Sequence, residues 1–379
     1  MDWRGAFMKS VNGYQIIQQF EELFPKYLAE EGDPIGLQVG SLSQKVNKVL
    51  IALDVNKAVI EEAIDIGANL IIAHHPIIYR PLKKIVTDNE VGQIFQLCLK
   101  HDISIYAAHT NVDCAETGVS DFLAEALELQ STKVLAPTYV DQLIKLVVYV
   151  PKTHEEQVRE ALGNAGAGHI GNYSHCTFTS EGLGTFMPMS GTNPFIGETG
   201  KLEKVEEVKI ETVIVKSKLK QAVNAMKKAH PYEEVAYDTF ELDNEGVSYG
   251  VGRIGEISHE MTVEEFARFV KEKLDLKGVR VVGNLTDKVK KVAIVGGDGN
   301  KFAFHAKRQG SDVYISGDIY YHVAQDFKME GLNIIDAGHN IEKVMKNGVK
   351  KLLDQKLERE KLSCEIVASS IDTDPFVFI

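Results

Sequence analysis

The stretch KVLIALDVNKAVIEEAIDIGANLIIAHHPI, residues 48–77, decides the fold class. It begins with the apolar run KVLIALDV, continues through NKAVIEEAIDIGA, where apolar residues recur at helical spacing, and ends in a second apolar run. A strand, a helix and a strand in this order predict two parallel strands joined by a crossover helix. The sequence therefore predicts an α/β fold for residues 1–131.

The last third of the chain repeats this order. KVAIVGGDGNKFAFHAKRQGSDVYISGDIYY, residues 291–321, also runs strand, Asn-Lys, helix, glycine turn and strand. A second pair, ISIYAAHTNVD and LNIIDAGHNIE, aligns if one residue is dropped, and this places His109 opposite His339. Chance similarity between two such units is the alternative. Two related halves that face each other would form one site at their strand ends, where open α/β sheets bind ligands.

The middle of the chain has a different pattern. LIKLVVYVP, THEEQVREALGNAG and YSHCTFTSEGLGTFMP read as strand, helix and glycine-broken strand, and VEEVKIETVIVKS, LKQAVNAMKKAH and VAYDTFELD as strand, helix and strand. The order β-α-β-β-α-β is that of ferredoxin-like domains. We therefore expect two related α/β halves, 1–131 and 244–379, that form one metal-binding domain, with a ferredoxin-like domain inserted at 141–243. LQSTKVLAPTYVD and DNEGVSYG are the expected linkers.

Composition indicates an ordinary globular protein. Of 379 residues, 44% are hydrophobic and 25% charged, which excludes a disordered chain. A net charge of −12 provides no basis for wrapping nucleic acid. The four cysteines are scattered without a CxxC pair, which favours reduced thiols. No apolar run approaches the about 18 residues of a membrane span, so we expect a cytoplasmic protein without a membrane anchor.

His74 and His75, followed by Pro76, end the second apolar strand. Adjacent side chains of a strand point to opposite sides, so both imidazoles serve one site only if the backbone turns or if two metals lie side by side. Pro76 favours a turn. The alternative is that one histidine caps the strand or hydrogen-bonds a loop.

Three more residues complete a candidate metal site. His339 and Glu342 are three apart, on one helical face, and Asp113 follows another strand. Three imidazoles and two carboxylates suit Zn, Fe, Mn or Ni rather than Ca. A single catalytic zinc usually takes three protein ligands, whereas two metals about 3.5–4 Å apart would use all five.

Other polar residues are weaker candidates. His109 is a candidate general acid or base, or a residue that holds Asp113 by a hydrogen bond. His322 is a candidate proton donor, with a surface helix histidine as the alternative. Asp54 ends the first strand and either orients a ligand or caps the strand.

GDPIGLQVG, IIAHHP, AAHTNVD, YGVGRIGEI and DAGHNIEKV together resemble the NGG-interacting factor family, whose members are described as dinuclear-metal-centre hexamers and labelled GTP cyclohydrolase 1 type 2 homologues. The middle third is similar to the PII- and CutA-like insert of longer bacterial members. The chain departs from the family twice. It has GDPIGLQ where many members read W-D-N-x-G-L-Q, and Glu342 is three rather than four residues after the histidine.

The resemblance implies two divalent ions per chain, zinc first with Fe, Mn or Ni open, and these ligands: His74, His75, Asp113, His339 and Glu342. It also implies a hydrolase of the GTP cyclohydrolase type, in which hydroxide opens a purine ring and His109 shuttles protons. The implied assembly is a homohexamer of two trimers that takes a small molecule, a purine nucleotide, as substrate. The alternative is a non-catalytic toroidal scaffold that stores or delivers metal or docks partners, with the insert as a regulatory sensor.

Overall fold

The protein is described by a computed structural model over residues 9–379. The chain divides into two compact units. Val140–Ser248 forms one unit, and the segments on either side of it form the other. None of the helices among residues 9–379 is both long and apolar enough to cross a membrane.

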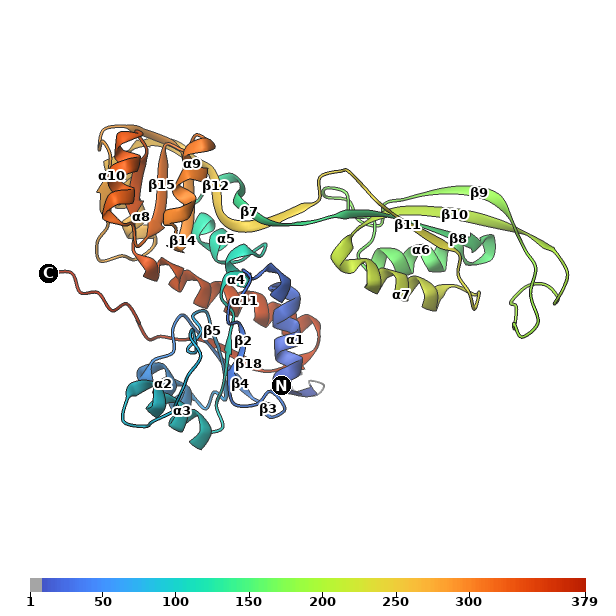
Figure 1. Ribbon diagram of the computed structural model, residues 1–379, viewed down its shortest axis with the longest axis horizontal. Coiled ribbons are helices and arrows are strands. Elements are labelled where there is room, and N and C mark those ends of the chain that lie inside the picture. Colours follow the sequence, from blue (N-terminus) through green and yellow to red (C-terminus); the bar gives the residue numbers. More distant parts are fainter. Residues whose placement is uncertain (1–8) are drawn as a thin grey trace, which may run out of the picture. The chain divides into compact units, whose positions relative to one another are not determined.

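A five-stranded sheet carries the N-terminal half of the larger unit (Figure 1), in the order β18-β4-β5-β6-β2. Its strands are β2 Gly36–Val39, β4 Lys48–Ala52, β5 Leu70–Ala73, β6 Ser104–Ala107 and β18 Glu365–Ala368. All neighbours are parallel except β2, which is antiparallel to β6. The crossover helices are α2 Lys57–Ile66 and α3 Glu90–Lys100. Asn56 caps α2 by accepting a hydrogen bond from the Val59 N–H, and Gly67 ends the helix in the left-handed region.

Both faces of this sheet are buried, which explains its continuous apolar runs. Leu50 and Ile71 face the core formed with α2 and α3. Their neighbours Val49 and Ile72 face the opposite way, into the largest core of the protein. The predicted strand-helix-strand unit of residues 48–77 is thus observed.

A six-stranded sheet carries the C-terminal half, in the order β13-β16-β15-β14-β12-β7. Its strands are β7 Gln130–Asp141, β12 Val247–Thr262, β13 Arg280–Val282, β14 Lys288–Asp298, β15 Val313–Gly317 and β16 Asn333–Asp336, and the helices of this half are α8 Val263–Lys273, α9 Ala303–Arg308 and α10 Tyr321–Met329. The β14, β15 and β16 strands are parallel and joined through helices, as β4, β5 and β6 are. The two halves therefore share the predicted plan.

The two sheets exchange strands. The edge strand β18 of the N-terminal sheet comes from the end of the chain, and β7 of the C-terminal sheet directly follows the N-terminal half in sequence. The segments expected as linkers are therefore largely strand, since they form β7 and the start of β12. The strand accommodates Pro137 because β7 is an edge strand, where one side of the backbone needs no partner.

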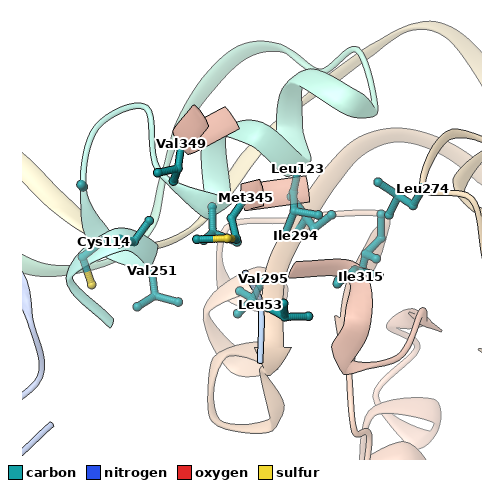
Figure 2. Close-up of a cluster of buried hydrophobic side chains, with 14 of the residues drawn as sticks. Leu53, Cys114, Leu123, Val251, Leu274, Ile294, Val295, Ile315, Met345 and Val349 are labelled. Carbon is teal, nitrogen blue, oxygen red and sulfur yellow. The ribbon is translucent and has the colours of Figure 1, made fainter. Parts of the chain in front are cut away.

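Helices between the sheets form a shared middle layer. They are α1 Gly13–Leu23, α4 Thr110–Cys114, α5 Val119–Ala126 and α11 Val344–Arg359. The α5 helix contacts β14 and α11, and α11 contacts β4 and β18. Leu123 of α5, Met345 of α11 and Ile294 of β14 meet in one buried cluster (Figure 2). A small sheet, β17-β1-β3, completes this unit with β1 Lys9–Asn12, β3 Lys45–Val46 and β17 Leu362–Ser363.

The smaller unit contains one antiparallel sheet, ordered β11-β8-β10-β9. In chain order its elements are β8 Leu143–Pro151, α6 Glu155–Asn164, β9 Thr177–Phe186, β10 Glu203–Val215, α7 Leu219–Ala229 and β11 Tyr237–Glu241. Alternate residues of β8, such as Leu146 and Val148, form a core with Val158 of α6 and Met226 of α7. The ferredoxin-like classification of this unit stays a prediction.

Candidate metal centre

The structure brings the five predicted ligands together from both halves of the larger unit. His74 and His75 follow β5, Asp113 lies in α4, and the short 3-10 helix His339–Lys343 contributes the last two. Glu342 occupies the middle of the cluster. Its Oε2 lies 3.1 Å from His75 Nε2, 3.3 Å from His339 Nε2 and 3.7 Å from His74 Nε2.

The backbone turns where the His-His pair begins, as the proline suggested. The β5 strand ends at Ala73, although the N–H groups of His74 and His75 still donate to carbonyls of the β4 end at 3.0 and 2.9 Å. The two ring centroids are 5.1 Å apart, and both imidazoles approach the Glu342 carboxylate. Both histidines therefore serve one site.

His74 supports the presence of a cation most directly. Its Nδ1 donates to the Ala108 carbonyl at 3.1 Å, so Nε2 carries a lone pair, and complete burial lowers the pKa of His74 to about 3. Among residues 9–379, this buried Nε2 has no hydrogen-bond partner, although Asp113 Oδ1 lies 3.5 Å away and Glu342 Oε2 3.7 Å away. A neutral imidazole lone pair beside two carboxylates is unfavourable unless a metal ion or a proton lies between them.

Three overlapping groups in the cluster have ligand atoms within 4.8 Å of one another. They are His74 with Asp113 and Glu342, His75 with His339 and Glu342, and His74 with His75 and His109. Two of the three groups share Glu342. The donor set could therefore hold more than one metal ion, with Glu342 as a ligand common to both. Imidazole with carboxylate is a donor set for Zn, Fe, Mn or Ni.

Carboxylates hold three of the histidine rings from behind. His75 Nδ1 lies 2.6 Å from Asp54 Oδ1, and His339 Nδ1 lies 2.7 Å from Asp318 Oδ2. His109 Nδ1 lies 3.0 Å from Asp33 Oδ1. Metal-binding histidines are typically oriented in this way, because the partner fixes the ring and its tautomer.

Without a metal, the cluster balances its charge with protons. Burial disfavours the imidazolium of His75, but hydrogen bonds to Asp54 and Glu342 outweigh it and raise its pKa to about 10. Contact with Glu342 raises the pKa of His339 to about 9. Burial opposes ionisation of Glu342, yet the two imidazoles hold its pKa well below the usual range. Burial and the Glu342 charge raise the pKa of Asp113.

Metal uptake is therefore expected to strengthen as pH rises. Ligands bind metal only when deprotonated. His75 and His339 keep their protons up to about pH 10 and pH 9 in the metal-free protein, so binding must release these protons throughout the neutral range. Zinc titration calorimetry in two buffers of different protonation enthalpy measures the release, with a chelator titrated in the same buffers as the control. Equal heats in both buffers and a pH-independent Kd would contradict this prediction.

The structure places the weaker candidates differently: His109 and Asp54 lie at the cluster, and His322 does not. His109 lies in the cluster, its ring 5.1 Å from that of His74, but its hydrogen-bond partner is Asp33 rather than Asp113. Asp54 orients His75, which was one of its two predicted roles. His322 is exposed on α10 and does not line the cavity, so its proposed role as proton donor is not supported by its position.

Two residues of the site, Asp318 and Asp33, were not predicted from the sequence. Asp318 aligns with His75 in the internal repeat, and this alignment was the available signal. Asp33 lies in the GDPIGLQ loop, where it also accepts a hydrogen bond from the Thr110 N–H at 3.0 Å. The GDPIGLQ loop therefore holds His109 at the start of α4, although the loop departs from the family pattern.

The cluster opens into a cavity of about 1300 Å³ lined by both halves of the larger unit. Asp54, His75 and Asp113 line it from the N-terminal side, and Asp318 and Glu342 from the C-terminal side. Cations also line it, namely Lys277, Arg280, Lys301 and Lys343. A small molecule thus has access to the cluster.

Two related α/β halves surround a partly buried cluster of histidines and carboxylates. They define the class: an α/β protein with groups that could hold metal ions. The chain belongs to the Duf34/NIF3 (NGG1p interacting factor 3) family, which matches residues 11–375. It is 58% identical over 371 residues to a Bacillus subtilis protein named GTP cyclohydrolase 1 type 2 homolog, with 98% of this chain and 100% of that protein covered.

Solved structures also match this chain. A Bacillus cereus protein related to NIF3 matches with a TM-score of 0.93 and 59% identity over 98% of this chain and 100% of its own. Protein SA1388 of Staphylococcus aureus matches with a TM-score of 0.76 and 34% identity at the same coverage. The suspected family resemblance is thus confirmed.

Proposed function

We propose that the chain is a dinuclear-metal hydrolase of the GTP cyclohydrolase type. The observation that carries this proposal is the carboxylate shared between two ligand groups: Glu342 belongs both to the group with His74 and Asp113 and to the group with His75 and His339. The names of the relatives supply the substrate class, a purine nucleotide. Two divalent ions, with zinc as the first candidate, would supply Lewis acidity to the substrate and to water.

The residues of the chain have separate tasks in this proposal. Glu342, His74, His75, His339 and Asp113 hold the ions, and the carboxylates behind His75 and His339 keep the rings in place. His109 lines the cavity and shuttles protons during the reaction. Burial lowers the pKa of His109, but its hydrogen bond to Asp33 outweighs burial and raises the pKa. Proton transfer by a positioned histidine typically contributes about 10²–10⁴-fold to a rate.

Metal content and formate release test the proposal together. We expect about two ions per chain in untreated or zinc-reloaded protein, and formate release from GTP at a rate that His109→Gln lowers about 10²-fold or more. Elemental analysis and a formate assay measure these. His322→Gln is the matched control, because His322 is exposed and outside the cavity.

The outcomes separate the two candidate functions. Stoichiometric metal without formate, in Zn, Mn and Fe forms alike, would reject the cyclohydrolase activity and favour a scaffold that stores or delivers metal. Protein that holds no metal even after reloading would reject the metal centre itself. The homohexamer of two trimers and the sensor role of residues 141–243 remain proposals that rest on the family resemblance.

A further inference from the structure

The C-terminal tail after β18 lies along the candidate metal centre. It forms no helix or strand, and Figure 1 shows it as an extended segment that ends the chain (red). Residues 372–378 nevertheless line the cavity that contains the cluster. A tail without regular structure in this place needs specific contacts to stay there.

Such contacts are present along the first part of the tail. At its start, the backbone N–H of Ser370 donates to Glu62 of α2 at 2.8 Å, and Lys346 donates to the Ile371 carbonyl at 3.1 Å. Further on, Asp372 accepts a hydrogen bond from Asn340, the residue next to His339, at 3.3 Å, and pairs with Lys277 at 3.4 Å. The tail thus joins the two halves across the cavity.

Directly after Asp372, one tail side chain connects to a metal-ligand candidate through a carboxylate. The half-buried Thr373 donates its hydroxyl hydrogen to Asp54 Oδ2. The other oxygen of the same carboxylate, Oδ1, lies 2.6 Å from His75 Nδ1. A carboxylate held at both oxygens cannot rotate without losing a bond, so Thr373 fixes the plane in which Asp54 receives the His75 ring.

We propose that Thr373 is a positioning residue for His75, acting through Asp54, so that docking of the C-terminal tail controls how tightly the centre holds metal. The proposal rests on the metal centre proposed above but not on its activity. When the tail is docked, Nδ1 of His75 points to Asp54 and Nε2 points to the centre of the cluster beside Glu342. When the tail leaves, Asp54 is free to turn toward water, and the ring loses its fixed orientation.

The test is metal affinity of the full chain, measured by chelator competition for zinc and by the visible absorption of the cobalt form. Loss of a hydrogen-bond partner behind a ligand costs about 10- to 100-fold in affinity. Thr373 acts one step further out, so Thr373→Val is expected to weaken binding up to about 10-fold and to alter the cobalt spectrum. Thr373→Ser keeps the hydroxyl and should restore both.

Matched variants separate positioning from general damage to the tail. Ser370→Ala removes a tail hydroxyl that binds Glu62 and not Asp54, and should leave affinity and spectrum unchanged. Removal of residues 375–379 keeps Thr373 and should have no effect, whereas removal of residues 371–379 should weaken binding at least as much as Thr373→Val. Unchanged affinity and spectrum in Thr373→Val would overturn the proposal. Equal losses in Thr373→Val and Ser370→Ala would also overturn it, while a parent protein without metal would overturn the centre itself.

Discussion

Glu342→Gln is expected to empty the metal centre. The Glu342 Oε2 atom approaches three imidazoles and belongs to two of the three ligand groups. Even a lost partner behind a ligand costs about 10- to 100-fold in metal affinity, so loss of this shared ligand should cost more than about 100-fold. Elemental analysis after desalting and chelator competition for zinc measure the loss.

Two comparisons make this result specific. Glu330→Gln alters an exposed carboxylate at the end of α10 and should retain metal as the parent does. Asp113→Asn removes a residue of only one of the two groups that share Glu342, and should leave about one ion bound. Full metal content in Glu342→Gln would reject the shared-carboxylate arrangement.

Arg253→Met is expected to destabilise the larger unit by about 3 kcal/mol, because it breaks an ion pair in which the arginine is buried and leaves Asp121 without its counter-charge. Arg253 is 5% exposed, and its Nε and Nη2 each lie 2.6 Å from a carboxylate oxygen of Asp121. It also donates to the carbonyls of Gly250, Gly252 and Ala115. The cost lies at the lower end of the range for a buried ion pair because Asp121 is partly exposed to solvent.

The residue before this arginine, Gly252, is connected by hydrogen bonds to the ligand candidate Asp113. Gly252 donates its N–H to Ser120 Oγ at 2.9 Å, and Ser120 donates to the Asp113 carbonyl at 3.0 Å. Gly252 has φ +75°, and a Cβ there would lie 2.6 Å from Val295, so only glycine fits. The glycine-rich YGVGRIGEI stretch therefore connects β12 to the helix that carries Asp113.

Hydrogen exchange of the β12 and α5 amides measures the opening free energy of this region. Arg268→Met is the control, since Arg268 forms an exposed i,i+4 pair with Glu264 that contributes about 0.3–0.5 kcal/mol. Arg253→Lys should fall between the two, because lysine keeps the charge but not the two parallel bonds. Equal protection in Arg253→Met and the parent would contradict the prediction.

The local elements and the candidate ligands followed from the sequence alone. Asn56 and Gly67 bound the first crossover helix, and the apolar runs around it are long enough only for buried strands. The family motifs then identified the ligand candidates by type and position. Each of these conclusions depends on residues close together in the chain.

Long-range contacts determined the rest. The exchange of β7 and β18 between the sheets, the carboxylates behind the histidines and the tail contact from Thr373 to Asp54 join residues far apart in sequence. The periodicity of the sequence does not predict such pairings. A carboxylate at a strand end has the same sequence pattern whether it caps the strand or orients a ligand. The sequence therefore determined which side chains could bind metal, and the tertiary structure decided that Glu342 lies between them, since only packing of the two halves brings the last third of the chain to the end of β5.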